Sequence, residues 1–577
     1  MSETEITMRF EDLPNEILVE CFEYFNTSEL FHSFGQLNRR FNQLIRTLPL
    51  HLNFQDVERE IYDVLCEQML TNPDAQERVY SLRLSNRNTP GQIEDFLSKF
   101  ALNQFYHLRS VTFIDIQENN LQSLQQNLPF LSQVTTLHLL DSETKLIELE
   151  SFLPMDNLQT LSFNSNMAFV QQTILIKSLI LSTISLNEMC CLYQYTPFLQ
   201  YLNVSCVRAG VLNSIYHKSP RPNDLKDLIL TDFRPLFVDL THFLQNKSSV
   251  RNFTFSSSSD MSMLDAPRWE RLIKSSLLDL KNFRFKLAVD HRLNQHNVCK
   301  IFDRFQRNFW LCEHQWLTKC LANKQSIMIF TIPYLTECRQ IPLVSKSYSN
   351  PQVDYSQTFN QLHKLVVSAG DLFEHANYQF SNITSLSITH APNLSSESDE
   401  ERVFESLTKL MNFSQLNHLE FPLDCQSGRP SLLFQILDLA PQLTSLRTKP
   451  CLLESLLNQP GAHRYLNSKI RKLDLSNYSS HQCTTPVRIR SLYQLIPNLE
   501  QLTMSITDIN DLFLLVDQFP KLSSFTVHFT SKDRPQPLDV FIKQALERKA
   551  LIHEIAIARR KFVLTLGVWM RKNKSTS

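Results

Sequence analysis

The side chains of this 577-residue chain that most invite a chemical interpretation are cysteines and histidines between residues 291 and 320. They are His291, His296, Cys299, Cys312, His314 and Cys320. Thiolate and imidazole groups are ligands that Zn²⁺ prefers, so these residue types would suit a zinc site. The group lacks a Cys-x-x-Cys pair, however, and a helix expected over 297–310 would place Cys299 on an apolar stripe with Phe302. We therefore predict ordinary core and surface positions, with no metal and no cofactor.

Signatures of catalysis and of phosphate binding are missing from the sequence. It contains no Gly-x-Ser-x-Gly elbow, no dinucleotide fingerprint and no P-loop, and only 7 glycines from which such loops could be built. The adjacent Cys190 and Cys191 are interpreted as small apolar residues, because neighbouring cysteines do not easily form an unstrained disulfide. The carboxylates of residues 399–401 lie in a polar run, for which we expect a solvated loop. We predict no catalytic residues and a protein that is not an enzyme.

The charge balance of the chain bounds its partners and its location. A formal net charge of −1 argues against binding to nucleic acid or to a membrane surface through bulk charge. The first residues carry no apolar core typical of a secretory signal, and no apolar run is long enough to span a bilayer. We expect a cytoplasmic or nuclear protein whose 12 cysteines stay reduced.

The segment from about residue 8 to residue 48 is rich in apolar side chains and is expected to form three short helices. Asp12 is suited to cap the first helix, and Pro14 is tolerated in its first turn. Apolar residues then recur at one-face helical spacing. They are Ile17, Leu18, Cys21, Phe22 and Phe25, then Leu30, Phe31 and Phe34, then Leu37, Phe41, Leu44, Ile45 and Leu48. A unit of roughly 40 residues does not bury so much apolar surface alone, which predicts a partner.

This segment resembles an F-box. The resemblance is carried by Leu13-Pro14-x-Glu16-Ile17-Leu18, Cys21-Phe22, Phe25, Leu30 and Leu37-Asn38-Arg39-Arg40-Phe41. In that family the motif docks into a Skp-type adaptor, which in turn binds a cullin. The resemblance implies that the adaptor contact is formed by Leu13, Pro14, Ile17, Leu18 and Phe22, with Leu30 and Phe41 shaping the rest of it. The alternative is an ordinary helical fragment packed on the rest of the chain.

A hexamer of the form apolar-x-x-apolar-x-apolar recurs after this segment, and its last positions alternate as in a strand with one buried face. Starting points, mostly 23 to 30 residues apart, are Val79, Leu108, Val134, Leu158, Ile176, Leu199, Leu225, Val250 and Leu280, then Leu362, Ile383, Leu416, Leu443, Ile470, Leu499, Leu522 and Ile552. Between the two series, residues 286–361 break the period and are interpreted as one enlarged repeat. Mobile polar loops are predicted at residues 256–259, 345–351 and 395–401.

These repeats resemble a degenerate leucine-rich-repeat solenoid, in which each unit buries its apolar face only against its neighbours. The resemblance implies an α/β fold, with an N-terminal three-helix F-box followed by an irregular solenoid that has a parallel sheet on its concave face. The predicted segments are a disordered N-terminus at 1–7, the F-box at 8–49, the solenoid at 50–570 with an irregular insertion at about 286–361, and a disordered C-terminus at 571–577. A helix over 538–549 and a capping strand over 562–568 complete the expected solenoid.

Residues between the apolar positions of a repeat strand face the concave side, where a ligand can reach them. The predicted target-binding residues are therefore Arg83, His138, Tyr201, Asp227, Arg284, Lys364, His418, Glu420, Arg447, Lys472 and Asp474. Both charge signs occur among them, which suits another protein as the ligand. The alternative is that these side chains only keep an open sheet soluble.

The two resemblances together imply a substrate-recognition subunit of a Skp–cullin–F-box ubiquitin ligase. Its partners would be a Skp-type adaptor, a cullin reached through that adaptor, and an unknown target protein. A leucine-rich-repeat scaffold acting outside a ubiquitin ligase is the alternative function. A third class, an enzyme that uses the 286–361 insertion, also stays open at this point.

Overall fold

A computed structural model describes most of the chain. The described residues are 9–22, 24–25, 27–34, 37–131, 133–140, 157–164, 175–210, 224–245, 247–258, 260–290, 295–322, 326–335, 346–349, 358–368, 380–389, 397–421, 431–450, 452–453, 462–476, 489–506, 508–529, 552–560 and 563–570. The fold is mixed α/β, with helices at the N-terminus and two large sheets that are mainly parallel. The predicted disordered ends and the helix expected over 538–549 lie outside the described residues.

The N-terminal segment folds into the helices α1 (Asn15–Phe22), α2 (Thr27–Phe34) and α3 (Arg39–Thr47), preceded by the short helical turn η1 (Phe10–Asp12). Asn38 caps α3, since its side-chain oxygen accepts a hydrogen bond from the backbone N–H of Phe41 at 2.7 Å. The apolar faces of the three helices meet in a small core of their own. This segment is therefore a distinct unit next to the sheets.

The first sheet begins directly after α3, and its early strands follow the predicted hexamers. Its first ten strands are β1 (Leu50–Asn53), β2 (Val79–Ser85), β3 (Ser110–Ile114), β4 (Thr136–Leu140), β5 (Thr160–Phe163), β6 (Ser178–Ser185), β7 (Tyr201–Arg208), β8 (Asp227–Leu230), β9 (Asn252–Ser257) and β10 (Asn282–Val289). Each pairs in parallel with the strand before it in the chain. The apolar positions occupy equivalent places in the ladder, as Leu82, Val111 and Leu137 do. The hexamers thus stack into one continuous core.

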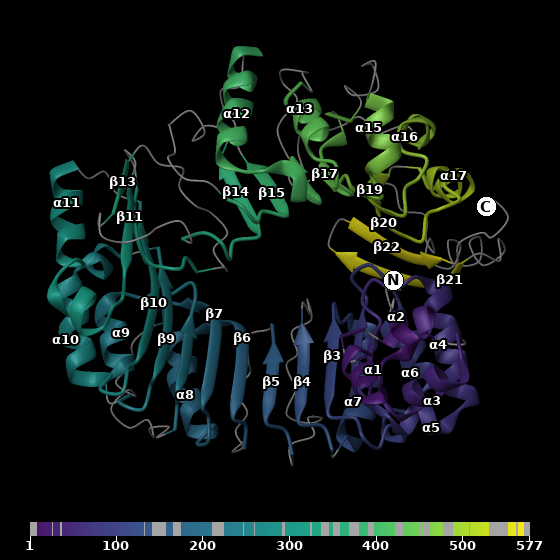
Figure 1. Ribbon diagram of the computed structural model, residues 1–577, viewed down its shortest axis with the longest axis horizontal. Helices are drawn as coiled ribbons and strands as arrows, with labels where there is room; N and C mark the ends of the chain where they lie inside the picture. The colour runs from purple at the N-terminus through teal and green to yellow at the C-terminus, as the bar shows by residue number, and fades with distance from the viewer. Residues whose placement is uncertain are drawn as a thin grey trace, which may run out of the picture.

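Within the described part of the chain, helices cover one face of the first sheet only (Figure 1). They are α4 (Arg59–Thr71), α5 (Pro73–Glu77), α6 (Gln92–Lys99), α7 (Glu118–Asn127), α8 (Leu186–Tyr195), α9 (Phe237–Leu244), α10 (Ala266–Ser276) and α11 (Gln295–Arg304). We call the face of each sheet opposite its helices the inner face. Strand residues alternate between the core and this inner face, as the burial pattern along β10 shows.

Residues 286–361 end the first sheet; they do not form one enlarged repeat within it. β12 (Ile327–Thr331) pairs antiparallel with β10 and with β11 (Thr318–Ala322), and β13 (Lys346–Tyr348) pairs antiparallel with β11. β12 is buried on both faces, because Ile329 packs in the first core and Phe330 in a second one. The expected parallel arrangement is therefore present as two sheets that are each mainly parallel. We call each sheet together with its helices an array. The second array packs against the end of the first.

The second sheet repeats the parallel arrangement. Its strands are β14 (Lys364–Ser368), β15 (Ser385–Thr389), β16 (His418–Phe421), β17 (Ser445–Thr448), β18 (Lys472–Asp474), β19 (Gln501–Ile506), β20 (Ser524–Phe529), β21 (Ile552–Arg560) and β22 (Val563–Met570). Its helices are α12 (Glu397–Leu410), α13 (Ser431–Leu439), α15 (Ala462–Lys469), α16 (Ile489–Leu495) and α17 (Ile509–Gln518). These helices lie on the outside of the arc that the strands form (Figure 1).

The C-terminal end of the second sheet is antiparallel. The strand order is β20-β22-β21, so β22 inserts between β20 and β21 and pairs antiparallel with both. We expected the hexamer at Ile552 to form a further parallel repeat. It forms the first strand of an antiparallel hairpin instead. Figure 1 shows this hairpin beside the N-terminal helices, so that the two arcs meet at both of their ends. The contact there is formed by Trp569, which belongs to the core of the first array.

Parts of all three segments that we expected to be mobile loops are ordered. In the segment 345–351, Lys346–Tyr348 form β13, and the other two segments are held by buried polar groups. Ser256 and Ser257 are buried at the end of β9, where the Ser257 hydroxyl donates a hydrogen bond to the Phe233 carbonyl at 2.8 Å. The acidic run at residues 397–401 forms the start of α12, with Glu400 buried. Polar composition was misleading at both sites because each contains a polar group with a buried hydrogen-bond partner.

Candidate functional site

The N-terminal helices bury only part of the apolar surface that the sequence assigned to the adaptor contact. Leu18, Phe22, Leu30 and Phe41 lie in the small core that the three helices share. The Phe22 and Phe41 rings meet edge to face at a centroid distance of 5.8 Å. In this conformation these four side chains shape the domain and are not accessible to a partner. A direct adaptor contact is left to Leu13, Pro14 and Ile17 among the predicted residues.

Arg40 fixes the backbone that presents these three residues. Its Nη1 donates to the Glu11 carbonyl and its Nη2 to the Leu13 carbonyl, both at 2.6 Å, while Nε donates to Oδ1 of Asn15 at 2.8 Å. The planar guanidinium thus spans the segment on either side of Pro14 with directed donors. Because Pro14 itself has no N–H to donate, this side chain supplies the tie between α3 and the entrance to α1.

Several large apolar side chains of this domain face solvent. Ile17 is 42 % exposed, Leu37 60 % and Tyr24 85 %, and Phe10 and Phe25 are also exposed. Pro14 is exposed and Leu13 half-buried beside them. Phe10 and Tyr24 were missed from sequence, because apolar periodicity does not tell which side of so small a unit packs inward. A concentration of exposed apolar residues in a unit of this size indicates a protein docking surface.

The N-terminal domain is joined to the first sheet by hydrogen bonds at its edge strand. The Thr27 hydroxyl of α2 donates to the His51 carbonyl of β1 at 2.8 Å, and Arg78 Nη1 donates to the Ile45 carbonyl of α3 at 3.0 Å. Both bonds satisfy backbone carbonyls at the boundary between the two units. The domain therefore covers the first edge of the sheet, which would otherwise expose unpaired backbone groups.

All of the predicted target-binding residues lie outside the two cores. In the first sheet, Arg83, His138, Tyr201, Asp227 and Arg284 are half-buried on the inner face. Arg83 Nε donates to Oε1 of Gln55 at 2.8 Å. Burial, and after it the Arg83 charge, lowers the pKa of His138. Arg83 and His138 thus lie in one row on either side of Thr112 of β3, whereas Arg284 lies at the far end of the sheet.

The second sheet gathers the remaining six predicted residues into two rows. Lys364, His418 and Lys472 occupy one ladder position of β14, β16 and β18. Glu420, Arg447 and Asp474 occupy the position two residues further along β16, β17 and β18. Arg447 is paired on both sides, at 3.5 Å with Glu420 and 3.1 Å with Asp474. Burial lowers the pKa of His418, whose Nδ1 lies 2.8 Å from the Ser445 hydroxyl. A role of these eleven residues in binding stays a prediction.

The first sheet also contains a row of amides that the list of predicted residues omitted. Asn282 Nδ2 donates to Oδ1 of Asn252 at 2.7 Å, and Asn252 Nδ2 donates to Oδ1 of Asp227 at 2.5 Å. The alternation along each strand could have identified Asn252 and Asn282, since both precede an apolar strand residue. Asp227 thus has a partner on its own sheet.

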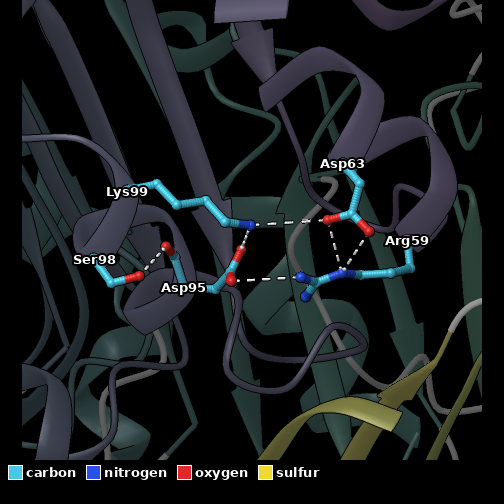
Figure 2. A network of polar contacts seen from close by, with 5 residues as sticks. All are labelled: Arg59, Asp63, Asp95, Ser98 and Lys99. Atoms are coloured by element: carbon cyan, nitrogen blue, oxygen red, sulfur yellow. Dashed lines mark hydrogen bonds and ion pairs between the residues drawn. The ribbon is translucent and has the colours of Figure 1, made fainter. Parts of the chain in front are cut away.

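A buried ion network lies between α4 and α6 and was also missed from sequence (Figure 2). Arg59 is 3.0 Å from Asp63 and 3.4 Å from Asp95, while Lys99 is 2.6 Å from Asp95. The Arg59 guanidinium also lies 4.6 Å from the Trp569 ring centroid, and the Tyr62 ring is 4.9 Å from the same ring. The network therefore supports the contact between the two ends of the molecule.

The cysteines and histidines between residues 291 and 320 do not come together at one site. Cys299 and Cys320 both lie near Tyr348, Cys312 is exposed, and the His314 ring stacks on Trp316 at 4.1 Å. Among the described residues, which leave out His291, no three potential ligands lie together as a metal site requires. Burial raises the pKa of the Cys66 and Cys190 thiols to about 12, so these two are unreactive core residues.

Comparison with protein families identifies the N-terminal unit. Residues 10–53 match the F-box domain, and this match supports an F-box protein. F-box domains typically bind Skp-type adaptors, are generally non-catalytic, and indicate a substrate-adaptor role in Skp–cullin–F-box ubiquitin ligases. A search of curated proteins returned no match to the chain. Within the part of the chain that the structure describes, no helix has the length and apolar character to cross a bilayer.

Proposed function

We propose that this chain is the substrate-recognition subunit of a Skp–cullin–F-box ubiquitin ligase. The observation that carries the proposal is the F-box match at residues 10–53 together with exposed Ile17, Tyr24 and Leu37 on that same unit. The adaptor would cover this apolar surface, and a cullin would join through the adaptor. The protein would act in the cytoplasm or the nucleus, where such ligases work.

The two arrays would form an irregular leucine-rich-repeat solenoid that binds a target protein. Parallel strands in chain order, each followed by a return on the outer side, support this interpretation. The chain would perform no covalent step itself. By holding a target beside the conjugating enzyme it would raise the effective concentration of a target lysine, which accelerates a bimolecular transfer.

Co-purification with a Skp-type adaptor tests the proposal. The variant Ile17→Asp, Leu37→Asp places two charges on the exposed apolar surface, and we expect it to weaken adaptor binding by about 100-fold, as for hot-spot residues. Both side chains are exposed, so thermal unfolding of the variant should match that of the native chain. Phe22 is unsuitable for this test, because its side chain lies in the domain core.

The matched control is Leu278→Asp, which adds a charge at a 70 % exposed leucine of the first array. It should co-purify with the adaptor as the native chain does. Absence of adaptor from the native preparation would refute the proposal. Adaptor binding without recruitment of a cullin would favour a scaffold acting outside a ligase.

A further inference from the structure

Arg284 differs from Arg83 and Arg447, the other two inner-face arginines of the predicted binding set, in how its side chain is partnered. Its Nε is buried and has no hydrogen-bond partner among the described residues. Arg83 instead donates to Gln55. Arg447 Nε also makes no hydrogen bond among the described residues, but this guanidinium has two carboxylate neighbours, Glu420 at 3.5 Å and Asp474 at 3.1 Å. A buried N–H group without a hydrogen-bond partner is destabilising. The position therefore suits a partner that comes from outside the chain.

The strand register places neutral groups and a second cation around Arg284. Thr254 of β9 is its direct ladder neighbour, and Ser256 is the neighbour of Lys286, two residues further along β10 on the same face. The Lys286 ammonium lies 5.9 Å from the Tyr334 ring centroid. Arg284 and Lys286 thus present adjacent positive charges along one strand.

The acidic side chain closest in register does not neutralise Arg284. Asp227 lies on β8 in the row of Asn252 and Asn282, not in the row of Thr254 and Arg284. Its Oδ1 accepts the Asn252 amide, which orients that carboxylate within its own row. The inner face of β9 and β10 therefore carries positive charge next to hydroxyl and amide groups.

We propose that the inner face of β9 and β10 binds an extended acidic segment of the target protein, with an aspartate or glutamate carboxylate on the Arg284 guanidinium. This inference rests on the proposed function, in which the arrays bind the target. A carboxylate matches the two parallel donors that a guanidinium offers. The Thr254 hydroxyl and the exposed Asn282 amide, on the same two strands, can serve as partners for the backbone of the segment.

Charge favours a protein over a nucleic acid as this ligand. Nucleic-acid surfaces commonly contact about 6 to 10 phosphates through a stripe of basic residues. On this part of the inner face only Arg284 and Lys286 are cationic among the described residues of β8, β9 and β10, and the chain as a whole has a net charge of −1. Two neighbouring cations suit a short acidic stretch of polypeptide.

Fluorescence anisotropy with a labelled ten-residue peptide of alternating glutamate and glycine tests the proposal on the full chain bound to its adaptor. We expect this peptide to bind, and its glutamine counterpart to bind at least about tenfold more weakly, since charge-assisted hydrogen bonds are lost. Arg284→Gln should weaken binding of the glutamate peptide by about tenfold. Arg271→Gln removes one charge from an exposed position of α10, on the opposite side of the first sheet, and should change the affinity by less than about twofold.

Three results would overturn the assignment: no binding of the glutamate peptide, equal binding of the glutamine peptide, or unchanged binding by Arg284→Gln. Tighter binding of a labelled ten-residue oligothymidylate that also depends on Arg284 would identify nucleic acid instead, and would equally refute it. Arg284→Gln should keep the adaptor bound. A native chain that keeps the adaptor but does not bind the glutamate peptide would refute this inference alone, whereas a native chain without adaptor would refute the proposed function.

Discussion

At the scale of single residues, Asp95 is the carboxylate on which the buried network between α4 and α6 depends. It pairs with Lys99 at 2.6 Å and with Arg59 at 3.4 Å, and the Arg59 side chain is only 4 % exposed. Removing Asp95 leaves Asp63 as the one carboxylate of this network for both Arg59 and Lys99, so positive charge stays buried with less compensation. Asp95→Asn is therefore expected to reduce the free energy of unfolding by about 3 kcal/mol.

Urea denaturation followed by tryptophan fluorescence measures this loss. Glu270→Gln is the control, because it removes an i,i+4 partner of Lys274 at an exposed site and should leave the midpoint unchanged. Equal midpoints for Asp95→Asn and Glu270→Gln would show that the network is solvated and contributes little.

Histidines on the inner faces predict how stability depends on pH. Burial lowers the pKa of His138, His418 and His528 in the folded chain. The unfolded histidines bind protons near pH 6.5, whereas the folded ones stay neutral to lower pH. Between these two pKa values the unfolded state binds more protons, so this contribution to stability is complete above about pH 6.5 and decreases as the pH falls below it.

The triple variant with glutamine at these three positions tests the sign of this effect. Its free energy of unfolding, measured between pH 7.5 and 5, should decrease less steeply than that of the native chain. The difference is about 1.4 kcal/mol for every tenfold by which folding weakens proton binding at a histidine. Carboxylates titrate at lower pH in both proteins and cancel in the comparison. An identical slope for the two proteins would mean that these histidines protonate in the folded state as readily as in the unfolded one.

At the scale of elements, Glu400 joins two successive helices of the second array. From α12 its Oε2 accepts hydrogen bonds from the Ser431 hydroxyl and, at 3.3 Å, from the backbone N–H of Leu432 in the first turn of α13. A helix N-terminus has N–H groups without intrahelical partners, and a carboxylate is well suited to accept them. Glu400→Ala should leave these donors unsatisfied and cost about 1 to 2 kcal/mol.

Hydrogen exchange of the first amides of α13 checks this prediction, together with the denaturation midpoint. Glu401→Ala is a matched control one residue away, since Glu401 is exposed on the same helix. Faster exchange should be confined to the Glu400 variant. Protection that is equal in both variants would show that the α13 terminus is satisfied by other groups.

The strands were predictable from sequence because each encodes its own burial. The spacing of Val79, Leu82 and Leu84 predicts a strand with one buried face, and β2 buries all three side chains. The sequence of a strand contains no such local signal for which other strand it pairs with. Ile552 has the same hexamer as Val79, yet its strand pairs antiparallel with β22, because the returning chain supplies a closer partner than the previous repeat.

The candidate site was predictable only in part, for a related reason. The inner-face positions follow from strand alternation, as Arg284 and Glu420 show. The adaptor surface does not follow, since Ile17 and Leu18 are adjacent and equally apolar but only Ile17 is exposed. Core and docking residues share one chemistry, and only the packing of the three helices separates them. The buried positions of Glu400 and Asp95 were missed because the sequence does not show which group a carboxylate will contact in the folded chain.

At the scale of the whole molecule, the two ends of the chain pack on one another. A sheet of successive parallel strands has two open edges, and each must be covered because its unpaired backbone groups would otherwise be exposed. Here the N-terminal domain covers the edge of β1, and the antiparallel hairpin of β21 and β22 covers β20. Trp569 of that hairpin then reaches the core of the first array beside α4. The arc that carries the F-box domain is thereby tied to the arc that ends the chain (Figure 1).

This closure predicts a long-range effect of one side chain. Trp569 is 1 % exposed and contacts Tyr62 and Arg59, so Trp569→Ala should cost about 3 to 5 kcal/mol of contact free energy. Because the two arrays have separate cores, we expect the hairpin of β21 and β22 to separate from α4 in this variant while both sheets stay folded. Small-angle scattering should then report a larger radius of gyration, and amides of α4 should exchange faster. Tyr106→Ala, at an exposed ring of the first array, should change neither quantity. Unchanged scattering with faster exchange throughout the second sheet would instead mean that Trp569 stabilises only its own hairpin.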